Sequence, residues 1–312
     1  MKDERGAKKI TRRRFLKWAG ALGALGLVGS YPVFIERYIV LTNTYRIHVP
    51  NLPHAFAGFR IVHLTDLHYG FLVPLAVIRS VVRRDNAIAR DITVCTGDFV
   101  HERQATGQID AVWPVLAELN APAGVFSVLG NHDHWADERR SQHWLTQTGQ
   151  DLRHKAVAVR KGGSTLWLAG AGDLWEDHTS LDGLLSGIPE SDCRLVLAHN
   201  PDTADTDFSS RVDLMISGHT HGGQVDIPLV GTPVLPVRNK TYSHGLKTSP
   251  RGFGVFISRG IGWAMYPVRF NCFPEIAVLE LVPAGAGEIG TKMSGQEPLS
   301  GPVYAKVEEN EM

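Results

Sequence analysis

Apolar residues recur along this chain in short runs, and several of these runs stop at a polar cluster. Four to seven consecutive apolar or β-branched residues suit a strand that is buried on both faces. Such runs predict strands at 59–65, 91–97, 123–129, 193–198 and 212–217. Weaker patterns predict further strands at 45–49, 155–159, 165–169, 254–258 and 275–281. We expect the first of these weaker strands to lie at a sheet edge.

Between the strands, apolar residues recur at the spacing of a helix. In 74–90 they fall at Leu75, Ile78, Val81 and Val82, and Pro74 stands where a missing backbone N–H costs little. Two further helices are predicted at 109–119 and 137–148. Strands that alternate with helices indicate an α/β fold of stacked layers, in which ligands bind at the carboxyl ends of the strands.

Five polar clusters follow the predicted strands at those ends. They are Asp66-Leu67-His68, Gly97-Asp98, Gly130-Asn131-His132-Asp133, Ala198-His199-Asn200 and Gly218-His219-Thr220-His221. Each cluster alone has an ordinary structural explanation, such as a solvated turn, a helix cap or a histidine at the edge of the core. Together they offer the carboxylate, amide and imidazole groups that bind divalent metals. The set therefore favours one metal site over five accidents.

These residue types suit the hydrolysis of a phosphate ester. Two metal ions about 3.5–4 Å apart can bind the phosphoryl oxygens, lower the pKa of a bridging water and offset charge in the transition state. A carboxylate has two oxygens and can bridge two ions, whereas an asparagine offers a neutral oxygen. An imidazole titrates near neutral pH, which suits an acid for the leaving group.

The order D-x-H, G-D, G-N-H-D, H and G-H-x-H resembles the calcineurin-like metallophosphoesterase superfamily, from about Arg60 to Gln224. The runs Tyr242–Leu246, Ser258–Trp263 and Pro267–Cys272 are similar to those of small bacterial exported or membrane-tethered phosphoesterases. The resemblance implies a layered sandwich of β-sheets flanked by α-helices. It also implies two divalent metal ions as cofactors, with Mn, Fe and Zn left open.

The resemblance further implies a role for each cluster. The first ion would be held by Asp66, His68 and His221. Both ions would be bridged by Asp98, and the second would be completed by Asn131, His199 and His219. The leaving oxygen would be protonated by His132, with Asp133 orienting that ring.

We therefore expect a two-metal hydrolase of phosphate esters, a phosphodiesterase above all, in which a metal-bridging hydroxide attacks an envelope or phospholipid-type substrate. One alternative is a hydrolase of UDP-2,3-diacylglucosamine, although that nucleotide is made in the cytoplasm and an export signal opposes it. A second alternative is a non-catalytic metal-binding scaffold, which the complete set of ligands opposes. A protein phosphatase ranks lowest, because Arg139 and Arg140 lack that class's signature.

The amino terminus predicts export. Residues 11–17 read Thr-Arg-Arg-Arg-Phe-Leu-Lys, which matches a twin-arginine signal, and a weakly apolar segment follows from Trp18 to Gly29. No clean Ala-x-Ala cleavage site follows, and the apolar run continues to Ile35, near the lower limit of about 17–25 residues for a membrane span. The signal is therefore either removed or retained as a membrane anchor. We expect the twin-arginine machinery as a partner, and a location in the periplasm or at the outer face of the cytoplasmic membrane.

These patterns divide the chain into a signal or anchor at 1–36, a phosphoesterase domain at 45–282 and a tail at 283–312. The tail is rich in Gly, Pro, Ser and Glu and is predicted to be disordered. Residues 1–17 carry eight basic and two acidic side chains, so the rest of the chain is acidic, with 24 basic against 30 acidic. An acidic body opposes non-specific binding of nucleic acid. We expect Cys95 and Cys193 to be core residues, not metal ligands or disulfides.

Overall fold

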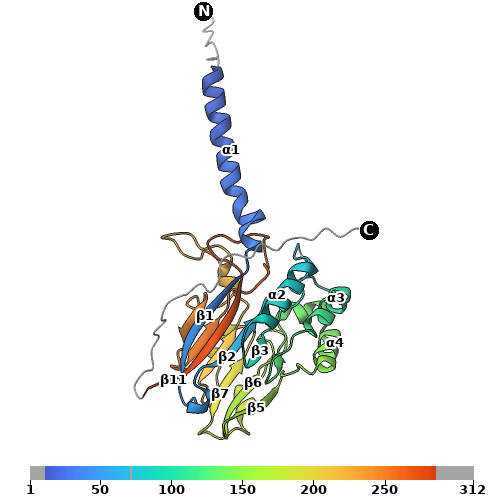
Figure 1. The fold of residues 1–312 in the computed structure, drawn as a ribbon, viewed down its shortest axis with the longest axis vertical. Coiled ribbons are helices and arrows are strands. Elements are labelled where there is room, and N and C mark those ends of the chain that lie inside the picture. The colour runs from blue at the N-terminus through green and yellow to red at the C-terminus, as the bar shows by residue number, and fades with distance from the viewer. Residues whose placement is uncertain (1–10, 71, 286–312) are drawn as a thin grey trace, which may run out of the picture.

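The structure is a computed structural model that describes residues 11–70 and 72–285 (Figure 1). The predicted disorder of the tail from residue 286 onward lies outside the described residues. Two sheets form the body. The first has the order β1-β11-β2-β3-β4, with β1 Leu41–Val49, β11 Glu275–Pro283, β2 Phe59–Leu64, β3 Ile92–Cys95 and β4 Val125–Ser127. The second has the order β5-β6-β7-β8-β10-β9, with β5 Lys155–Lys161, β6 Ser164–Gly170, β7 Cys193–Leu197, β8 Leu214–Ser217, β10 Gly254–Ile257 and β9 Gly245–Thr248.

Parallel pairing dominates the middle of both sheets. In the first sheet β2, β3 and β4 run parallel, and β11 pairs antiparallel with β2 and parallel with β1. In the second sheet β6, β7, β8 and β10 run parallel, and β5 and β9 are antiparallel edges. Parallel strands end at the same edge of a sheet, so the segments after β2 and β3, and those after β7 and β8, can meet. The predicted edge strand is confirmed as part of β1.

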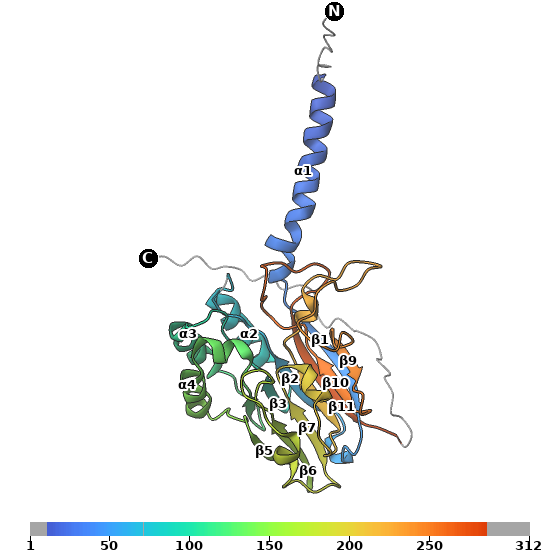
Figure 2. The same cartoon turned by 180° about the vertical axis from the view of Figure 1, so that it is seen from behind.

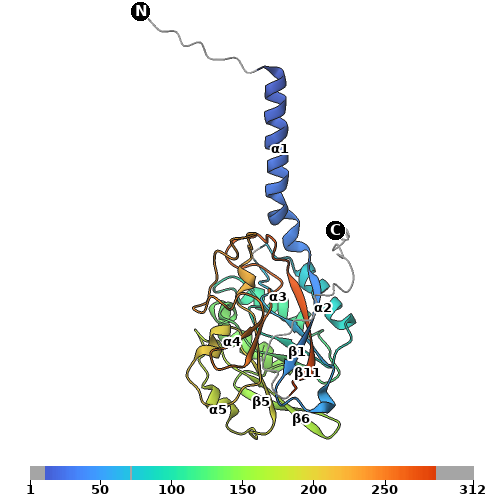
Figure 3. The same ribbon diagram turned by 90° about the vertical axis from the view of Figure 1, so that its left-hand side faces the viewer.

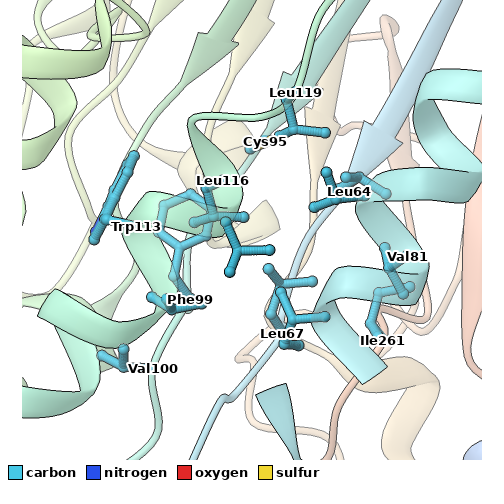
Figure 4. Close-up of a cluster of buried hydrophobic side chains, with 14 of the residues drawn as sticks. Leu64, Leu67, Val81, Cys95, Phe99, Val100, Trp113, Leu116, Leu119 and Ile261 are labelled. Atoms are coloured by element: carbon cyan, nitrogen blue, oxygen red, sulfur yellow. The ribbon is translucent and has the colours of Figure 1, made fainter. Parts of the chain in front are cut away.

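Alternate side chains of β2 pack into different apolar layers. Ile61 of β2 faces the layer between the two sheets, and the next residue, Val62, faces the helices. The helices on that side are α2 Leu75–Ala87, α3 Thr106–Leu116 and α4 Asn131–Thr148. Figure 4 shows part of this outer cluster, in which Trp113 and Leu116 of α3 approach Phe99. A third apolar cluster lies on the other face of the second sheet and includes side chains of the short helix α5, Leu181–Leu185. The expected α/β fold of stacked layers is confirmed.

One helix differs from its prediction in a way that matters for chemistry. Helix α4 begins at Asn131 instead of residue 137, so Asn131, His132 and Asp133 form its first turn. The backbone at Asp137 leaves helical geometry (φ −174°, ψ 96°), and only the part beyond it carried a recognisable helical pattern. Strand β9 was also missed. Its four residues include only one large apolar side chain, Leu246.

Helix α1, Arg12–Phe34, projects away from the body (Figures 2 and 3). Its N-cap is Thr11, whose hydroxyl accepts a hydrogen bond from the backbone N–H of Arg14 at 3.4 Å. Its last turn meets the body where the carbonyl of Pro32 accepts from the N–H of Arg269 at 3.1 Å. Within the described residues, no helix combines the length and the apolar character that crossing a bilayer requires. The cysteines Cys95, Cys193 and Cys272 are free and buried, as expected for the first two.

Candidate metal centre

Five of the seven predicted ligands share an unusual backbone conformation. Positive φ angles occur at Asp66 (54°), His68 (48°), Asp98 (55°), His219 (68°) and His221 (52°). Non-glycine residues rarely adopt this left-handed region, and each instance costs of the order of 1 kcal/mol. Such strain persists only where the surroundings impose it, and it is concentrated at functional sites. Here it lies in the turns that follow the strands and aims these side chains at one point.

The first group of candidate ligands comes from the first and the last of the five motifs. Nε2 of His221 lies 3.3 Å from Oδ1 of Asp66 and 3.0 Å from Nε2 of His68. The three side chains are buried, and their ligand atoms lie within 4.8 Å of one another. The carboxylate of Asp66 also accepts from the backbone N–H of His219 at 3.0 Å, which ties the turn after β2 to the turn after β8.

The second group consists of Asp98, His199 and His219, whose ligand atoms also lie within 4.8 Å of one another. Nδ1 of His219 lies 3.1 Å from Nε2 of His199. Oδ2 of Asp98 is 3.3 Å from Nε2 of His199 and 3.4 Å from Nε2 of His68. Asp98 therefore stands between the two groups, at the position that a bridging carboxylate requires.

Backbone carbonyl groups fix the orientations of the two histidine rings in this group. Nδ1 of His199 lies 2.7 Å from the carbonyl oxygen of Thr96, and Nε2 of His219 lies 3.1 Å from that of Pro236. A carbonyl oxygen can only accept, so each of these nitrogens carries the proton. The opposite nitrogen of each ring is then the atom free to bind a cation.

Asn131 supplies a separate indication that a cation belongs here. Its side chain is buried, and Oδ1 has no hydrogen-bond partner among the described residues. A buried amide oxygen without a partner is costly, and a metal ion would satisfy it. The two His/Asp groups and this orphaned oxygen together suit the binding of two divalent ions.

Two glycines are required by the close packing of this site. A Cβ atom at Gly218 would overlap the hydroxyl of Thr65 and the carboxylate of Asp66. A Cβ atom at Gly130 would overlap the carboxylate of Asp98. Both glycines precede candidate ligands in the motifs, so larger residues there would displace the carboxylates.

The electrostatics reflect several ionisable groups in one buried place. Burial disfavours ionised Asp98, but the surrounding histidines, His199 foremost, together outweigh this effect and hold the pKa of Asp98 well below its usual range. Burial by itself lowers the pKa of His199, but the carboxylates of Asp98, Asp66 and Asp173 together outweigh it and raise that pKa to about 10. Burial lowers the pKa of His219 to about 3, so that ring is neutral at pH 7. Without a metal, the structure therefore favours an Asp98–His199 ion pair.

The expected partnership of His132 and Asp133 needs a correction. Nδ1 of His132 lies 2.6 Å from the carbonyl oxygen of His101, which therefore orients the ring. The Asp133 carboxylate instead accepts from the backbone N–H groups of Asp98 (2.8 Å), Phe99 (2.9 Å) and Gly130 (3.0 Å). Asp133 joins two motif loops, because its carboxylate satisfies donors that the turn after β3 leaves unpaired.

A pocket of about 340 Å³ opens beside these residues. Asp98, Asn131, His132, His219 and His221 contribute to its polar side. Its other walls are mostly apolar and include Trp135, Trp175, Val234, Met265 and Tyr266. Trp135 and Trp175 both lie over the site. Their rings lie 6.5 Å apart, against His132 and His219 respectively.

Two residues that contact the candidate ligands were not among the predicted site residues. Arg269 is fully buried, donates to the carbonyl of His221 at 3.0 Å, and has Nη2 3.3 Å from Nδ1 of that ring. Its membership of the run Pro267–Cys272 was the available signal. The second is His101, whose Nδ1 lies 3.2 Å from Nδ1 of His68 and whose ring stacks on His132.

Comparisons with known proteins agree with this geometry. Residues 59–223 match the family model described as calcineurin-like phosphoesterase, and residues 9–29 match a twin-arginine translocation signal sequence. The uncharacterized metallophosphoesterase YkuE of Bacillus subtilis is 32% identical over 283 residues, which cover 88% of this chain and 98% of YkuE. The phosphodiesterase YaeI of Escherichia coli is 33% identical over 286 residues, covering 88% of this chain and all (100%) of YaeI.

A more distant relative has a named substrate. The UDP-2,3-diacylglucosamine pyrophosphatase LpxG of Chlamydia trachomatis is 26% identical over 288 residues, covering 73% of this chain and 86% of LpxG. The family match covers the segment that carries all five motifs, and those motifs converge on one buried centre. The chain therefore belongs to the calcineurin-like phosphoesterase family and is a hydrolase that acts on phosphate esters.

Proposed function

We propose that this protein is a two-metal phosphodiesterase. The observation that carries the proposal is the position of Asp98 between two His/Asp groups, beside the orphaned oxygen of Asn131. Asp66, His68 and His221 would hold one ion, and Asn131, His199 and His219 would hold the other. Two divalent ions supply, when bound, the positive charge that activates water and offsets charge on the phosphoryl oxygens.

His132 is the residue best placed to handle the leaving group. It lines the pocket, and its Nδ1 proton is donated to the carbonyl of His101. Nε2 is therefore the nitrogen that can exchange a proton with substrate. Trp135 and Trp175 cover this side of the pocket and restrict the access of bulk water.

We propose an envelope phosphodiester, of phospholipid type, as the substrate. The apolar pocket walls suit a phosphate ester that carries an apolar group. The twin-arginine signal takes the folded chain out of the cytoplasm, so the substrate would be met in the periplasm or at the outer face of the cytoplasmic membrane. Manganese is the first metal to test among Mn, Fe and Zn.

A pyrophosphatase acting on UDP-2,3-diacylglucosamine is the second candidate, because LpxG has that name and covers most of this chain. That substrate also combines acyl chains with a phosphate linkage. The export signal counts against it, since the nucleotide is made in the cytoplasm. A non-catalytic scaffold ranks third, because the seven predicted ligands and His132 are all present.

The test is hydrolysis of bis-p-nitrophenyl phosphate by the full chain, first metal-free and then with Mn²⁺. Asp98→Ala should lose the Mn²⁺-dependent activity, whereas His143→Ala, an exposed histidine of α4, should retain it. Comparing phosphatidylglycerol with UDP-2,3-diacylglucosamine then separates the two substrate classes. A folded protein that binds two ions and cleaves no phosphodiester would overturn the proposal and favour the scaffold.

A further inference from the structure

The exposed apolar side chains of the body are concentrated around one opening. We use the term apolar rim for Ile227, Leu229, Val230, Val234, Met265 and Tyr266. Leu229 is completely exposed, and the exposed fractions of Val230 and Tyr266 are 74% and 67%. Isolated exposed apolar residues are common on proteins, but a contiguous group of them marks an interaction surface.

The two loops that carry the apolar rim are joined to each other. The carbonyl of Phe270 accepts from the N–H of Asp226 at 2.9 Å, and the carbonyl of Gln224 accepts from the N–H of Phe270 at 2.9 Å. The side-chain amide of Gln224 donates to the carbonyls of Tyr266 and Val268 at 2.8 and 3.0 Å. The rim residues therefore belong to one surface.

This surface is also uncharged. No Asp, Glu, Lys or Arg occurs in 227–236 or in 260–268, although one residue in five of the whole chain is charged (21%). A surface that meets a protein partner usually has a polar border around its apolar centre and makes direct hydrogen bonds to the partner. Long uncharged loops with exposed aliphatic and aromatic side chains suit the interfacial layer of a bilayer better.

The apolar rim is connected to the candidate metal centre. Val234, Met265 and Tyr266 line the pocket whose polar side includes Asp98 and His219. The carbonyl of Pro236, at the end of the first rim loop, accepts from Nε2 of His219 at 3.1 Å. An apolar group held at the rim therefore leads directly to the candidate ligands.

The export signal leaves the body beside the same surface. The backbone N–H of Arg269 donates to the carbonyl of Pro32, in the last turn of α1. Just after α1, the guanidinium of Arg37 donates to the carbonyl of Pro267 at 3.3 Å. The carboxylate of Glu36 accepts from the N–H of Cys272 at 2.9 Å. Figures 1 and 2 show the orange loops of this region at the base of α1. Because α1 carries most of the segment that matches the export signal, the apolar rim lies at the end of the body from which that signal extends.

We infer that the apolar rim docks on the surface of a lipid bilayer and that the pocket receives its phosphate ester from the lipid layer. Docking is carried by the side chains of both loops and adds to any contact that α1 makes. The second part of the inference rests on the proposed function, whereas the docking itself does not. A lipid substrate would then enter with its apolar part along Val234, Met265 and Tyr266 and its phosphate toward Asp98.

The direct test places a fluorescent label on the rim of the full chain. The native cysteines are buried, so Leu229→Cys can be labelled selectively with bimane. Vesicles of phosphatidylethanolamine and phosphatidylglycerol with brominated acyl chains should quench this label. The same label on Gln147→Cys, an exposed position of α4, should remain unquenched. Binding of the chain through α1 alone would leave both labels unquenched and would overturn the inference.

A second variant measures the contribution of the rim to binding. Leu229→Asp with Val230→Asp should weaken binding to these vesicles by roughly tenfold or more, because two exposed apolar side chains are replaced by charges. Ala89→Asp with Gln147→Glu adds the same charge at exposed positions elsewhere and should bind as the parent does. The measurement is made at high salt, which screens the basic residues near Lys17.

The outcomes separate docking from catalysis. Neither Leu229 nor Val230 lines the pocket, so the double variant should keep the parent rate on bis-p-nitrophenyl phosphate. Equal vesicle binding by parent and double variant would overturn the inference, as would a Leu229 label that is protected by self-association of the chain in solution. Quenched label in a chain without phosphodiesterase activity would leave docking intact and refute only the proposed function.

Discussion

Nδ1 of His132 lies 2.6 Å from the backbone carbonyl oxygen of His101. This hydrogen bond fixes both the ring orientation and the tautomer, because a carbonyl oxygen accepts only. It leaves Nε2 as the working atom of His132. The contact comes from the main chain of a residue 31 positions away, so no side-chain motif records it.

Replacing His132 should therefore affect poor leaving groups most. We expect His132→Ala to lower kcat by about 10²–10⁴ on a diester of a simple alcohol, because the departing alkoxide needs a proton. The loss should be much smaller for bis-p-nitrophenyl phosphate, whose leaving group is stable as an anion. Rates for a series of diesters with graded leaving-group pKa values provide the measurement. An equal loss across the series would assign His132 to binding or charge stabilisation instead of proton transfer.

Asn131 should show opposite effects with and without metal. Its orphaned oxygen destabilises the metal-free protein. Without metal, Asn131→Leu should therefore leave the free energy of unfolding unchanged or raise it by up to about 1–2 kcal/mol. The same variant should lose much of the thermal stabilisation that Mn²⁺ gives the parent. Thermal unfolding with and without Mn²⁺ measures both effects.

Asn200 provides the matched control for this experiment. It is buried next to a candidate ligand, and its Nδ2 has no partner among the described residues, but its Oδ1 accepts from the N–H of Asp202 at 2.9 Å. Asn200→Leu should therefore destabilise the metal-free protein by about 1 kcal/mol through loss of a cap. If Asn131→Leu were destabilising to the same extent, the amide of Asn131 would have a structural role.

His63 should make stability depend on pH. It is buried beside Thr96, and burial lowers its pKa from 6.5 to about 3. Below pH 6.5 the unfolded chain binds a proton that the folded chain refuses, so stability is lost as the pH falls from about 6.5 toward about 3. At pH 5 the loss should be about 2 kcal/mol.

The measurement is the difference in unfolding free energy between pH 7.5 and pH 5, for the parent and for His63→Gln. Other buried histidines titrate in both proteins and cancel in this comparison. We expect the parent to lose about 2 kcal/mol more than the variant. The same pH dependence in both proteins would mean that His63 takes up its proton in the folded state.

Arg269 should be far more sensitive to conservative replacement than an exposed arginine. Its guanidinium is fully buried and donates to the carbonyls of His221 and Arg259 at 3.0 and 2.9 Å. Lysine cannot reproduce this planar set of donors, so Arg269→Lys should cost about 3 kcal/mol in urea unfolding. Arg46→Lys, at an exposed ion pair with Glu280, should cost less than about 0.5 kcal/mol. Equal costs would show that the Arg269 contacts contribute little.

Local sequence pattern determined most of the elements. The runs at 59–65 and 193–198 are apolar enough to specify buried strands without reference to their neighbours, and β2 and β7 lie there. The start of α4 was not predictable in this way. Its first turn, with Asn131, His132 and Asp133, is polar on every face and is held by contacts to the turn after β3.

The sequence by itself determined which chemical groups this protein has and in what order they follow its strands. It therefore indicated the phosphoesterase motifs and the export signal. Only the tertiary structure decided that Asp98 lies between two groups of ligands, that Asp133 binds backbone amides, and that the apolar rim lies beside the end of α1. The physical reason is that strand patterns are local, whereas these relationships depend on left-handed turns and main-chain hydrogen bonds between segments far apart in the chain.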